Sequence, residues 1–306
     1  MRKTLTVICA STQLLLPLFS LGYPETATIL VSHTLPSPRT LIALLARGLG
    51  EIKGLTSEQK VDISTSRKLR RQIEARLILQ WAFESNSYAF SRPLSPIKKS
   101  SQIWRVVWIE KKFLLREDRR EKGVPRDAVN VELVSLAKTS AYLFLDIKGV
   151  NESLRRYLPQ VDSVTEKDVE RALRIARIMG RSEMFVTPLS AEVSDRLNIV
   201  GSEGKINTYC PLDWLREPPL QGLVEDLLVH LRLLAKVEDP SDLPKHRREK
   251  LRFILPLSLE RIVQAGRIVE YLKPVEIDVK VKGEYTIAET PDGGRVILPK
   301  EFLGVG

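Results

Sequence analysis

The stretch Ser32–Glu51, SHTLPSPRTLIALLARGLGE, contains the signals for both ends of a helix. Ser37 is a favourable N-cap, and Pro38 suits the first helical position because its ring presets the backbone angle. Gly48 or Gly50 can end the helix, since glycine is common just past a helix C-terminus. Leucine and isoleucine recur at helical spacing and form one broad apolar face: Leu41, Ile42, Leu44, Leu45 and Leu49. We therefore predict a helix that packs on a core.

The residues around this helix extend the prediction in both directions. Pro36 and Pro38 force an extended approach to it. Arg39 and Arg47 lie outside the apolar face, and Arg39 at the helix entrance is placed to meet a ligand. Lys3–Ala10 has strand-like residues, and a long loop separates it from the helix. A strand, a loop and a capped helix in this order predict the first βα unit of a ferredoxin-like domain.

The first residues, MRKTLTVICASTQLLLPLFSLG, allow two interpretations. A basic start followed by an apolar run resembles a signal peptide. The polar segment Ser11–Gln13 and Pro17 interrupt the run, which is also too short to cross a membrane. We favour a buried first strand. A mature chain beginning after Gly22 would contradict this choice, so processing of the run stays open.

Composition favours a globular chain with an anionic partner. The 306 residues can bury a substantial core in one or two domains. The net charge of +10 favours nucleic acid or an acidic protein surface as a partner, although charge does not specify a fold. An abundance of Lys, Arg and Glu is also typical of thermophile proteins, which weakens this inference.

Familiar catalytic and metal-binding motifs are absent from the sequence. Cys9 and Cys210 make no disulfide framework and fit a reducing compartment, so we expect a cytoplasmic protein. The three histidines, His33, His230 and His246, are far apart, and no Cys/His pattern has zinc spacing. No P-loop, GxGxxG or GxSxG motif occurs. We predict no cofactor and no metal.

The middle of the chain alternates between helix-like and strand-like segments. Thr56–Phe83 has helical spacing of its apolar residues, and Ser91–Lys99 is typical of a Pro/Ser loop. Ile103–Leu115 is rich in β-prone residues and predicts a strand. A charged loop at Arg116–Arg126 and a third strand at Val131–Ile147 follow.

A capped helix and a strand complete this domain. Asn151–Val164 is a polar connection, and Thr165–Met179 begins with the capping-box pair Thr165 and Asp168. Met184–Val193 is strand-like. The element order predicts an α+β fold, with a ferredoxin-like or RRM-like βαββαβ domain over residues 1–195 and an inserted segment over about residues 54–130.

Residues 196–306 form a second unit, which we predict to be a C-terminal helical and β-hairpin extension. Leu220–Val237 and Leu257–Leu272 are apolar enough for two helices. Val275–Ala288 and Arg295–Leu298 predict a β-hairpin across an Asp-Gly-Gly turn.

Two groups of side chains could face a nucleic acid. Trp104 and Trp108 share one face of their predicted strand and could stack on bases, although such residues more often belong to the core. Basic residues lie opposite the apolar side of the Thr165–Met179 helix and continue past its end: Arg171, Arg174, Arg177 and Arg181. A solvated helix face is the alternative explanation.

Several segments together resemble one protein family. LVSHTLPSPRTLIALLARGL resembles that family's Pro-rich approach to a helix ending in Gly-Leu. SRPLSPIKK, EDRRE and RIMGRSEMFVTP resemble, in the same order, a Pro-Leu-Ser-Pro segment, a basic loop and a Gly-containing turn before a strand. On these segments the chain resembles family 5 of the CRISPR-associated RAMP superfamily, and more narrowly its type I-A branch. The resemblance covers residues 1–194, and the C-terminal third only loosely.

The resemblance implies a non-catalytic, crRNA-binding subunit of a Cascade complex in antiviral defence. The implied partners are the crRNA 5′ handle, the backbone subunit and the large subunit, with target DNA contacted indirectly and no membrane. Matching positions imply RNA contacts by these residues: Arg39, Lys98, Lys99, Arg119, Arg120, Arg177, Gly180, Arg181 and Ser182. The alternative is that Gly180 only ends a helix and that the basic loops are solvated.

Two other functions stay open. One branch of the family cleaves precursor RNA without metal, which needs a base for the 2′-OH and charge stabilisation at the phosphate. His33, with Tyr23 and Arg39 nearby in the sequence, could form such a site, although a lone histidine more often packs in its loop. The type I-A resemblance argues against cleavage. A protein-only scaffold, with Leu220–Val237 as its contact segment, is the third possibility.

Overall fold

The structure is a computed structural model of the whole chain. It describes residues 7–19, 29–30, 32–56, 58–64, 70–107, 126–179, 185–234, 239–240, 243, 249–264 and 266–305. Within these residues no helix is both long enough and apolar enough to cross a membrane.

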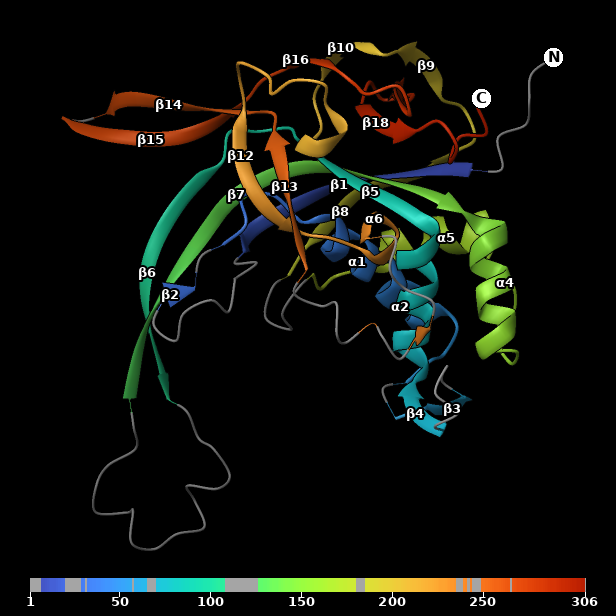
Figure 1. Cartoon of the computed structure of the whole chain (residues 1–306). Helices are drawn as coiled ribbons and strands as arrows, with labels where there is room; N and C mark the ends of the chain where they lie inside the picture. The colour runs from blue at the N-terminus through green and yellow to red at the C-terminus, as the bar shows by residue number, and fades with distance from the viewer. Residues whose placement is uncertain are drawn as a thin grey trace, which may run out of the picture.

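A six-stranded sheet forms the centre of the molecule (Figure 1). Its long middle strand β7 pairs antiparallel with β1 on one side and with β5 and then β6 on the other. β1 also pairs antiparallel with β8, and the short β2 runs parallel to β7. The strand bounds are β1 Val7–Phe19, β2 Ile29–Leu30, β5 Ser87–Pro93, β6 Lys98–Val107, β7 Arg126–Asp146 and β8 Thr187–Ser194. Because β1 and β5 are both antiparallel to β7, they are parallel to each other with β7 between them.

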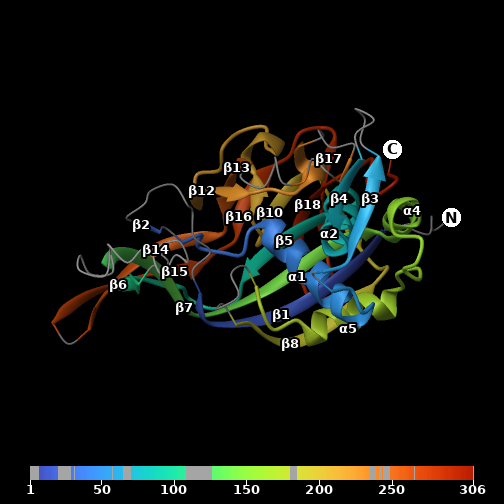
Figure 2. The same ribbon diagram turned by 90° about the horizontal axis from the view of Figure 1, so that it is seen from below.

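A layer of helices covers one face of this sheet, as Figures 1 and 2 show. The helices are α1 (Pro38–Ile52), α2 (Ala75–Asn86), α4 (Ile147–Tyr157) and α5 (Glu166–Ile175). The start of α1 is as predicted, because the Ser37 hydroxyl accepts a hydrogen bond from the Thr40 backbone N–H. Its predicted end is wrong, since α1 runs past both glycines. Gly48 instead allows close packing, because a Cβ there would collide with the backbone carbonyl of Ala172 in α5.

The core elements follow the order β1, α1, β5 with β6, β7, α5, β8, and the α+β class is confirmed. Thr165 and Asp168 form the predicted capping box at the start of α5. The helix predicted over Thr56–Phe83 is wrong in its first part. That part is the hairpin of β3 (Lys60–Ser64) and β4 (Arg70–Glu74), and α2 begins only at Ala75.

The polar connection predicted at Asn151–Val164 is also wrong in its first half, which belongs to α4. The Asp146 side chain caps this helix by accepting a hydrogen bond from Gly149 N–H at 3.0 Å. Val150 and Leu154, one helical turn apart, are buried and hold the helix on the core.

The C-terminal unit is mostly β-structure rather than helical. Its elements are β9 (Asn198–Gly201), β10 (Glu203–Ile206), β11 (Cys210–Pro211), the short 3-10 helix η2 (Leu212–Trp214), β12 (Leu223–Leu228), α6 (Leu231–Leu234), β13 (Lys250–Leu255), β14 (Leu257–Gln264), β15 (Arg267–Pro274), β16 (Ile277–Lys280), β17 (Tyr285–Glu289) and β18 (Arg295–Pro299). The hairpin of β17 and β18 confirms the prediction made from its Asp-Gly-Gly turn.

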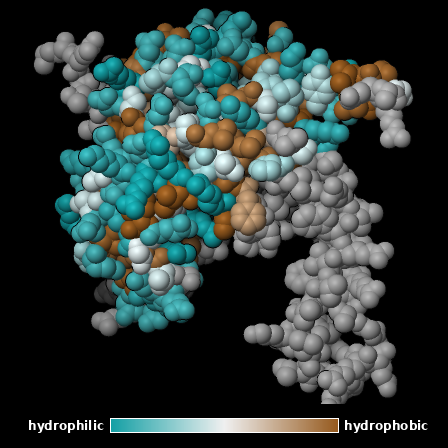
Figure 3. Space-filling model, turned by 180° about the vertical axis from the view of Figure 1, so that it is seen from behind, coloured by the Kyte–Doolittle hydropathy of each residue, from teal (hydrophilic) through white to brown (hydrophobic). Residues whose placement is uncertain are grey.

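Both helices predicted in this unit are wrong. Leu220–Val237 holds β12 and only a short α6, and Leu257–Leu272 belongs to the hairpin of β14 and β15. Gly266, with φ of 74°, makes the turn of this hairpin. The hairpin projects from the body (Figure 1), and apolar side chains gather toward its end (Figure 3). Ile262, Val263 and Ile268 are exposed near the turn, and Leu259 is exposed closer to the base.

The C-terminal unit packs on β5 and β7, on the face of the sheet away from the helices (Figure 1), and its β12 and α6 also contact α1 and α2. Phe90 of β5 contacts the rings of Tyr209 and Trp214, and Tyr88 contacts Phe302. The Tyr142 hydroxyl of β7 donates to the Asp292 carboxylate at 2.9 Å, which ties the β17–β18 turn to the central sheet. The two units therefore share one continuous core.

Candidate nucleic-acid interface

The described residues include five of the predicted site residues: His33, Arg39, Lys98, Lys99 and Arg177. The others lie outside the described residues, namely Tyr23, Arg119, Arg120, Gly180, Arg181 and Ser182, as does Trp108.

Lys98 and Lys99 begin β6, directly after Ile97, which bridges to Leu272 of β15 through two backbone hydrogen bonds of 2.8 Å. Neighbouring residues in a strand point to opposite faces. Lys98 is accordingly exposed, whereas the Lys99 ammonium donates to the Ser32 carbonyl at 3.0 Å. Of the two, Lys98 is the exposed residue and Lys99 is half-buried.

His33 is almost completely buried, with 1% of its surface exposed. Its Nδ1 lies 3.2 Å from Oε1 of Glu225 in β12, and the Thr34 backbone N–H donates to the same carboxylate at 3.0 Å. Burial alone would raise the pKa of Glu225, but the hydrogen bond from His33, the charge of Lys99 and the bond from Thr34 lower it overall. An ionised carboxylate only accepts hydrogen bonds, so Nδ1 of His33 carries the hydrogen and is the donor.

Arg39 was predicted to lie outside the apolar face at the helix entrance, near enough to meet RNA, but the structure buries it. The side chain is buried, and its Nε donates to Oε1 of Glu84 in α2 at 3.0 Å. Gln80 donates to the same carboxylate oxygen at 2.6 Å. Burial raises the pKa of Glu84 to about 7, although the charge of Arg39 and the bond from Gln80 act in the opposite direction. Arg39 therefore links α1 to α2 through a buried ion pair and does not face solvent.

Arg177 follows the C-terminal end of α5 and is exposed. Its Nη1 donates to the Arg174 carbonyl at 2.8 Å, which folds the side chain back along the helix end. α5 ends at Ile175, before the predicted end at Met179. Arg171 and Arg174 are exposed on α5, as their spacing predicts, and Arg174 pairs with Glu170 at 2.6 Å. We name Arg171, Arg174 and Arg177 the α5 ridge.

The structure does not bring Lys98 and Arg177 into one compact cluster. α5 packs against β8 and β1, on one side of β7. β6 pairs with β7 from its other side. These two exposed cations therefore lie on separate parts of the molecule, Lys98 at the start of β6 and Arg177 after the end of α5.

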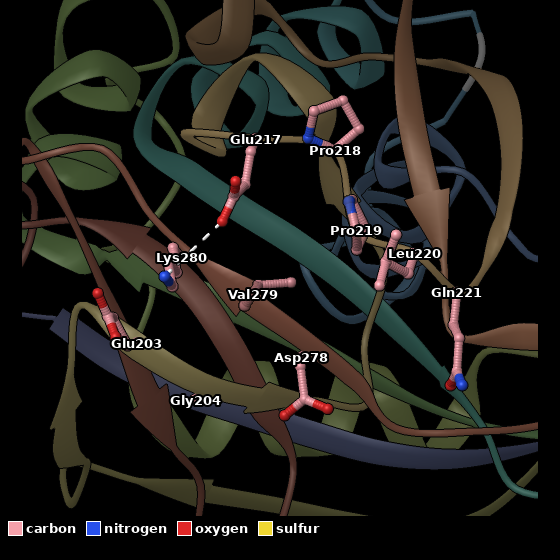
Figure 4. A pocket seen from close by; sticks show the side chains of 10 residues that line it. All are labelled: Glu203, Gly204, Glu217, Pro218, Pro219, Leu220, Gln221, Asp278, Val279 and Lys280. Carbon is pink, nitrogen blue, oxygen red and sulfur yellow. Dashed lines mark ion pairs between the residues drawn. The ribbon is translucent and has the colours of Figure 1, made fainter.

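A hollow of about 520 Å³ opens on the C-terminal unit beside β10 and β16 (Figure 4). Three carboxylates line it, from Glu203, Glu217 and Asp278, and Lys280 supplies the one cation among the lining residues. The Glu217 carboxylate points toward Lys280, with 3.8 Å between the charged atoms. This excess of negative charge would repel phosphate, so the hollow is unsuited to nucleic acid.

The site residue that the sequence could not reveal is Glu225. It lies 192 positions after His33, in a segment whose leucines predicted a helix, and no local pattern links the two. Among the described residues, no group of three or more His, Cys, Asp or Glu side chains could hold a metal ion.

Comparison with known proteins gives structural neighbours only. No protein-family model matches the chain, and no curated protein matches it. The chain is similar to the crystal structure of a CRISPR protein from Archaeoglobus fulgidus, with 12% identity, a TM-score of 0.44 and coverage of 95% of this chain and 99% of that one. It is also similar to a chain of a CRISPR RNA-guided surveillance complex, with 12% identity, a TM-score of 0.40 and coverage of 87% and 91%.

Proposed function

We propose that this chain is a non-catalytic, RNA-binding subunit of a CRISPR effector complex, and that it holds the 5′ handle of crRNA. The contrast between Lys98 and His33 carries the proposal. Lys98, in one of the segments that resemble the handle-binding family, is exposed, whereas the one candidate base described is buried. An exposed cation suits contact with a polyanion.

The state of His33 favours binding over cleavage. A general base must reach the 2′-OH whose proton it takes. The ring of His33 is shielded from solvent at 1% exposure, which keeps it away from an RNA bound at the surface. We propose that the pair of His33 and Glu225 fixes the loop before α1 to β12 and carries no chemistry.

The proposed partners follow from the same role. We propose that the handle-bound chain contacts the backbone subunit and the large subunit of its complex. The exposed apolar end of the β14–β15 hairpin supports a protein contact, because patches of this kind mark interaction sites.

A titration of the purified chain with fluorescent handle RNA tests the binding role. We expect tighter binding of the handle than of a scrambled RNA of equal length, and affinity that falls steeply as salt is raised. Lys98→Ala should weaken binding and flatten the salt dependence. Lys148→Ala is the matched control, since Lys148 is also exposed but lies on α4. Equal affinity for handle and scrambled RNA would contradict the proposed role.

The absence of cleavage needs a separate experiment. The chain is incubated with its repeat RNA in chelator, and the products are separated on a denaturing gel. We expect intact RNA. Cleavage at one position that disappears in a folded His33→Ala variant would overturn the non-catalytic proposal and establish a metal-independent endoribonuclease.

A further inference from the structure

A groove of about 300 Å³ lies on the helix layer, where α1, α2 and the segment after α5 meet. Its volume is at the small end of the range for ligand sites, which suits a single ring system. Apolar and polar surface line the groove in similar shares, and its apolar residues are Ala43, Leu44, Ala46, Leu77 and Ile178.

Three polar side chains complete the lining: Arg47, Arg76 and Gln80. Two are guanidinium groups, and none of the lining residues is acidic. The groove is therefore positively charged, whereas the hollow beside β10 and β16 is negatively charged. An apolar floor with two cations suits a ligand that combines a flat apolar ring with a negative charge.

Contacts within the helix layer hold these polar groups in place. Nε of Arg76 donates to the Leu55 carbonyl at 2.7 Å, and the Gln80 amide nitrogen donates to Glu84 at 2.6 Å. Arg47 lies 3.8 Å from Glu51, and the two side chains are 39% and 48% exposed. An exposed pair at this distance is weak, so an incoming phosphate can compete for Arg47.

Positive charge continues beyond the groove. Ile178 lines the groove, and the residue before it is Arg177 of the α5 ridge. α5 packs directly against α1, which carries Arg47. A free nucleotide would fill the groove alone, whereas a strand of several phosphates would also meet the ridge. The arrangement therefore favours a polymer over a small anion.

We propose that this groove holds one nucleotide of a single-stranded RNA, with the base on the apolar floor and the phosphate on Arg47 and Arg76. The proposal rests on the proposed RNA-binding role and adds a second contact surface, on the helix layer and away from Lys98. The strand would continue from the groove along the α5 ridge.

The test measures the affinity of the full chain for a short fluorescent oligoadenylate across a salt series. Arg47→Ala should weaken binding about tenfold, the loss of one charge-assisted hydrogen bond, and should lower the salt slope by about one. Arg155→Ala is the matched control, because Arg155 is an exposed arginine on α4. We expect it to change affinity less than twofold, about the effect of an unused surface charge.

A second variant separates base binding from general charge attraction. Ala43→Leu fills the groove without changing the charge, and leucine suits a helix. We expect it to weaken oligoadenylate binding while thermal unfolding stays unchanged. Unchanged affinity in Ala43→Leu would overturn the proposal, because the base would then lie elsewhere. Equal losses in Arg47→Ala and Arg155→Ala would also overturn it.

Parallel titrations distinguish this proposal from the proposed function. If Lys98→Ala weakens handle binding but Arg47→Ala does not, the groove proposal alone fails. If the wild-type chain binds no RNA, both fail. Binding of oligoglutamate at the groove in preference to oligoadenylate, lost in Arg47→Ala, would reassign the groove to an acidic protein segment and overturn the RNA proposal.

Discussion

Nδ1 of His33 donates a hydrogen bond to Oε1 of Glu225 across 3.2 Å, and this contact joins the loop before α1 to strand β12 of the C-terminal unit. His33 lies in the first βα segment of the chain, and Glu225 in a strand of another sheet. The bond therefore fastens the Pro-rich approach of α1 to the C-terminal unit. His33 therefore has a structural role, because it links the loop before α1 to β12.

Removal of the Glu225 charge should destabilise the protein at neutral pH. The folded pKa of Glu225 is lowered below its ordinary value of 4.5, so its contribution is complete above that value and disappears as pH falls through the folded pKa. We expect Glu225→Gln to lower the free energy of unfolding by about 1–3 kcal/mol at neutral pH and by less in acid. Urea unfolding across a pH series measures this. An effect independent of pH would show that the charge is unimportant.

The buried pair of Arg39 and Glu84 should respond to pH in the opposite sense. Burial raises the folded pKa of Glu84 from 4.5 to about 7, so the folded state binds more protons than the unfolded state between these values. Stability from this group should therefore fall as pH rises through this window. Glu84→Gln should flatten that part of the stability profile. If the free energy of unfolding of the wild type rose between about pH 5 and pH 7, the raised pKa of Glu84 would be contradicted. A Glu84→Gln profile of the same shape as the wild type would contradict it as well.

Two glycines of α1 should respond oppositely to alanine. A Cβ at Gly48 would collide with the Ala172 carbonyl of α5, and backbone cannot move aside cheaply. We expect Gly48→Ala to cost about 1–3 kcal/mol, in the range of overpacked cores. At Gly50 the nearest atoms would lie 3.8 Å away, so Gly50→Ala should stabilise the helix by about 0.5–1 kcal/mol. Thermal unfolding of the two variants makes the comparison, and equal effects would contradict the packing of α1 on α5.

Tyr142 should couple the C-terminal unit to the central sheet. Its hydroxyl donates to the Asp292 carboxylate, and Asp292 also accepts from the Thr290 hydroxyl at 2.6 Å. We expect Tyr142→Phe to lower the free energy of unfolding by about 1.5–3 kcal/mol, the range for a hydrogen bond to a charged group. Tyr271→Phe on β15 serves as the control, with little change expected. Faster proteolysis within the β17–β18 turn of Tyr142→Phe would locate the effect.

The projecting hairpin should govern association more than stability. Val263 and Ile268 are direct cross-strand partners and are 77% and 71% exposed. Threonine at both positions keeps β-propensity and removes apolar surface. We expect the unfolding free energy to change by less than about 0.5 kcal/mol, as for surface substitutions, while self-association in sedimentation experiments falls. Unchanged association would show that this surface makes no contact in the isolated chain.

The residues of α1 show how far local sequence reasoning reaches. Ser37, Pro38 and the leucine spacing correctly placed its start and its buried face, because a cap acts on backbone groups within a single turn. Its end was misjudged. A glycine can stop a helix or can let another backbone approach, and only the position of α5 shows that Gly48 does the second.

The C-terminal unit shows where periodicity fails. The apolar residues of Leu257–Leu272 fit helical spacing, yet they belong to two strands whose exposed faces are also apolar. A short apolar segment without a clear alternation does not distinguish helix from strand. The β17–β18 hairpin was predictable because its Asp-Gly-Gly turn demands a special backbone, and Gly293 has a φ of 78°.

The sequence by itself determined the local elements: the capped starts of α1 and α5, the long strand β7, the final hairpin and the order that makes an α+β domain. Caps, turns and apolar spacing act over a few residues, so they can be recognised without the rest of the chain. Only the tertiary structure decided which cations face solvent and which are buried. Arg39 meets Glu84 and His33 meets Glu225 because packing brings distant segments together, and burial then makes each of these pairings energetically necessary.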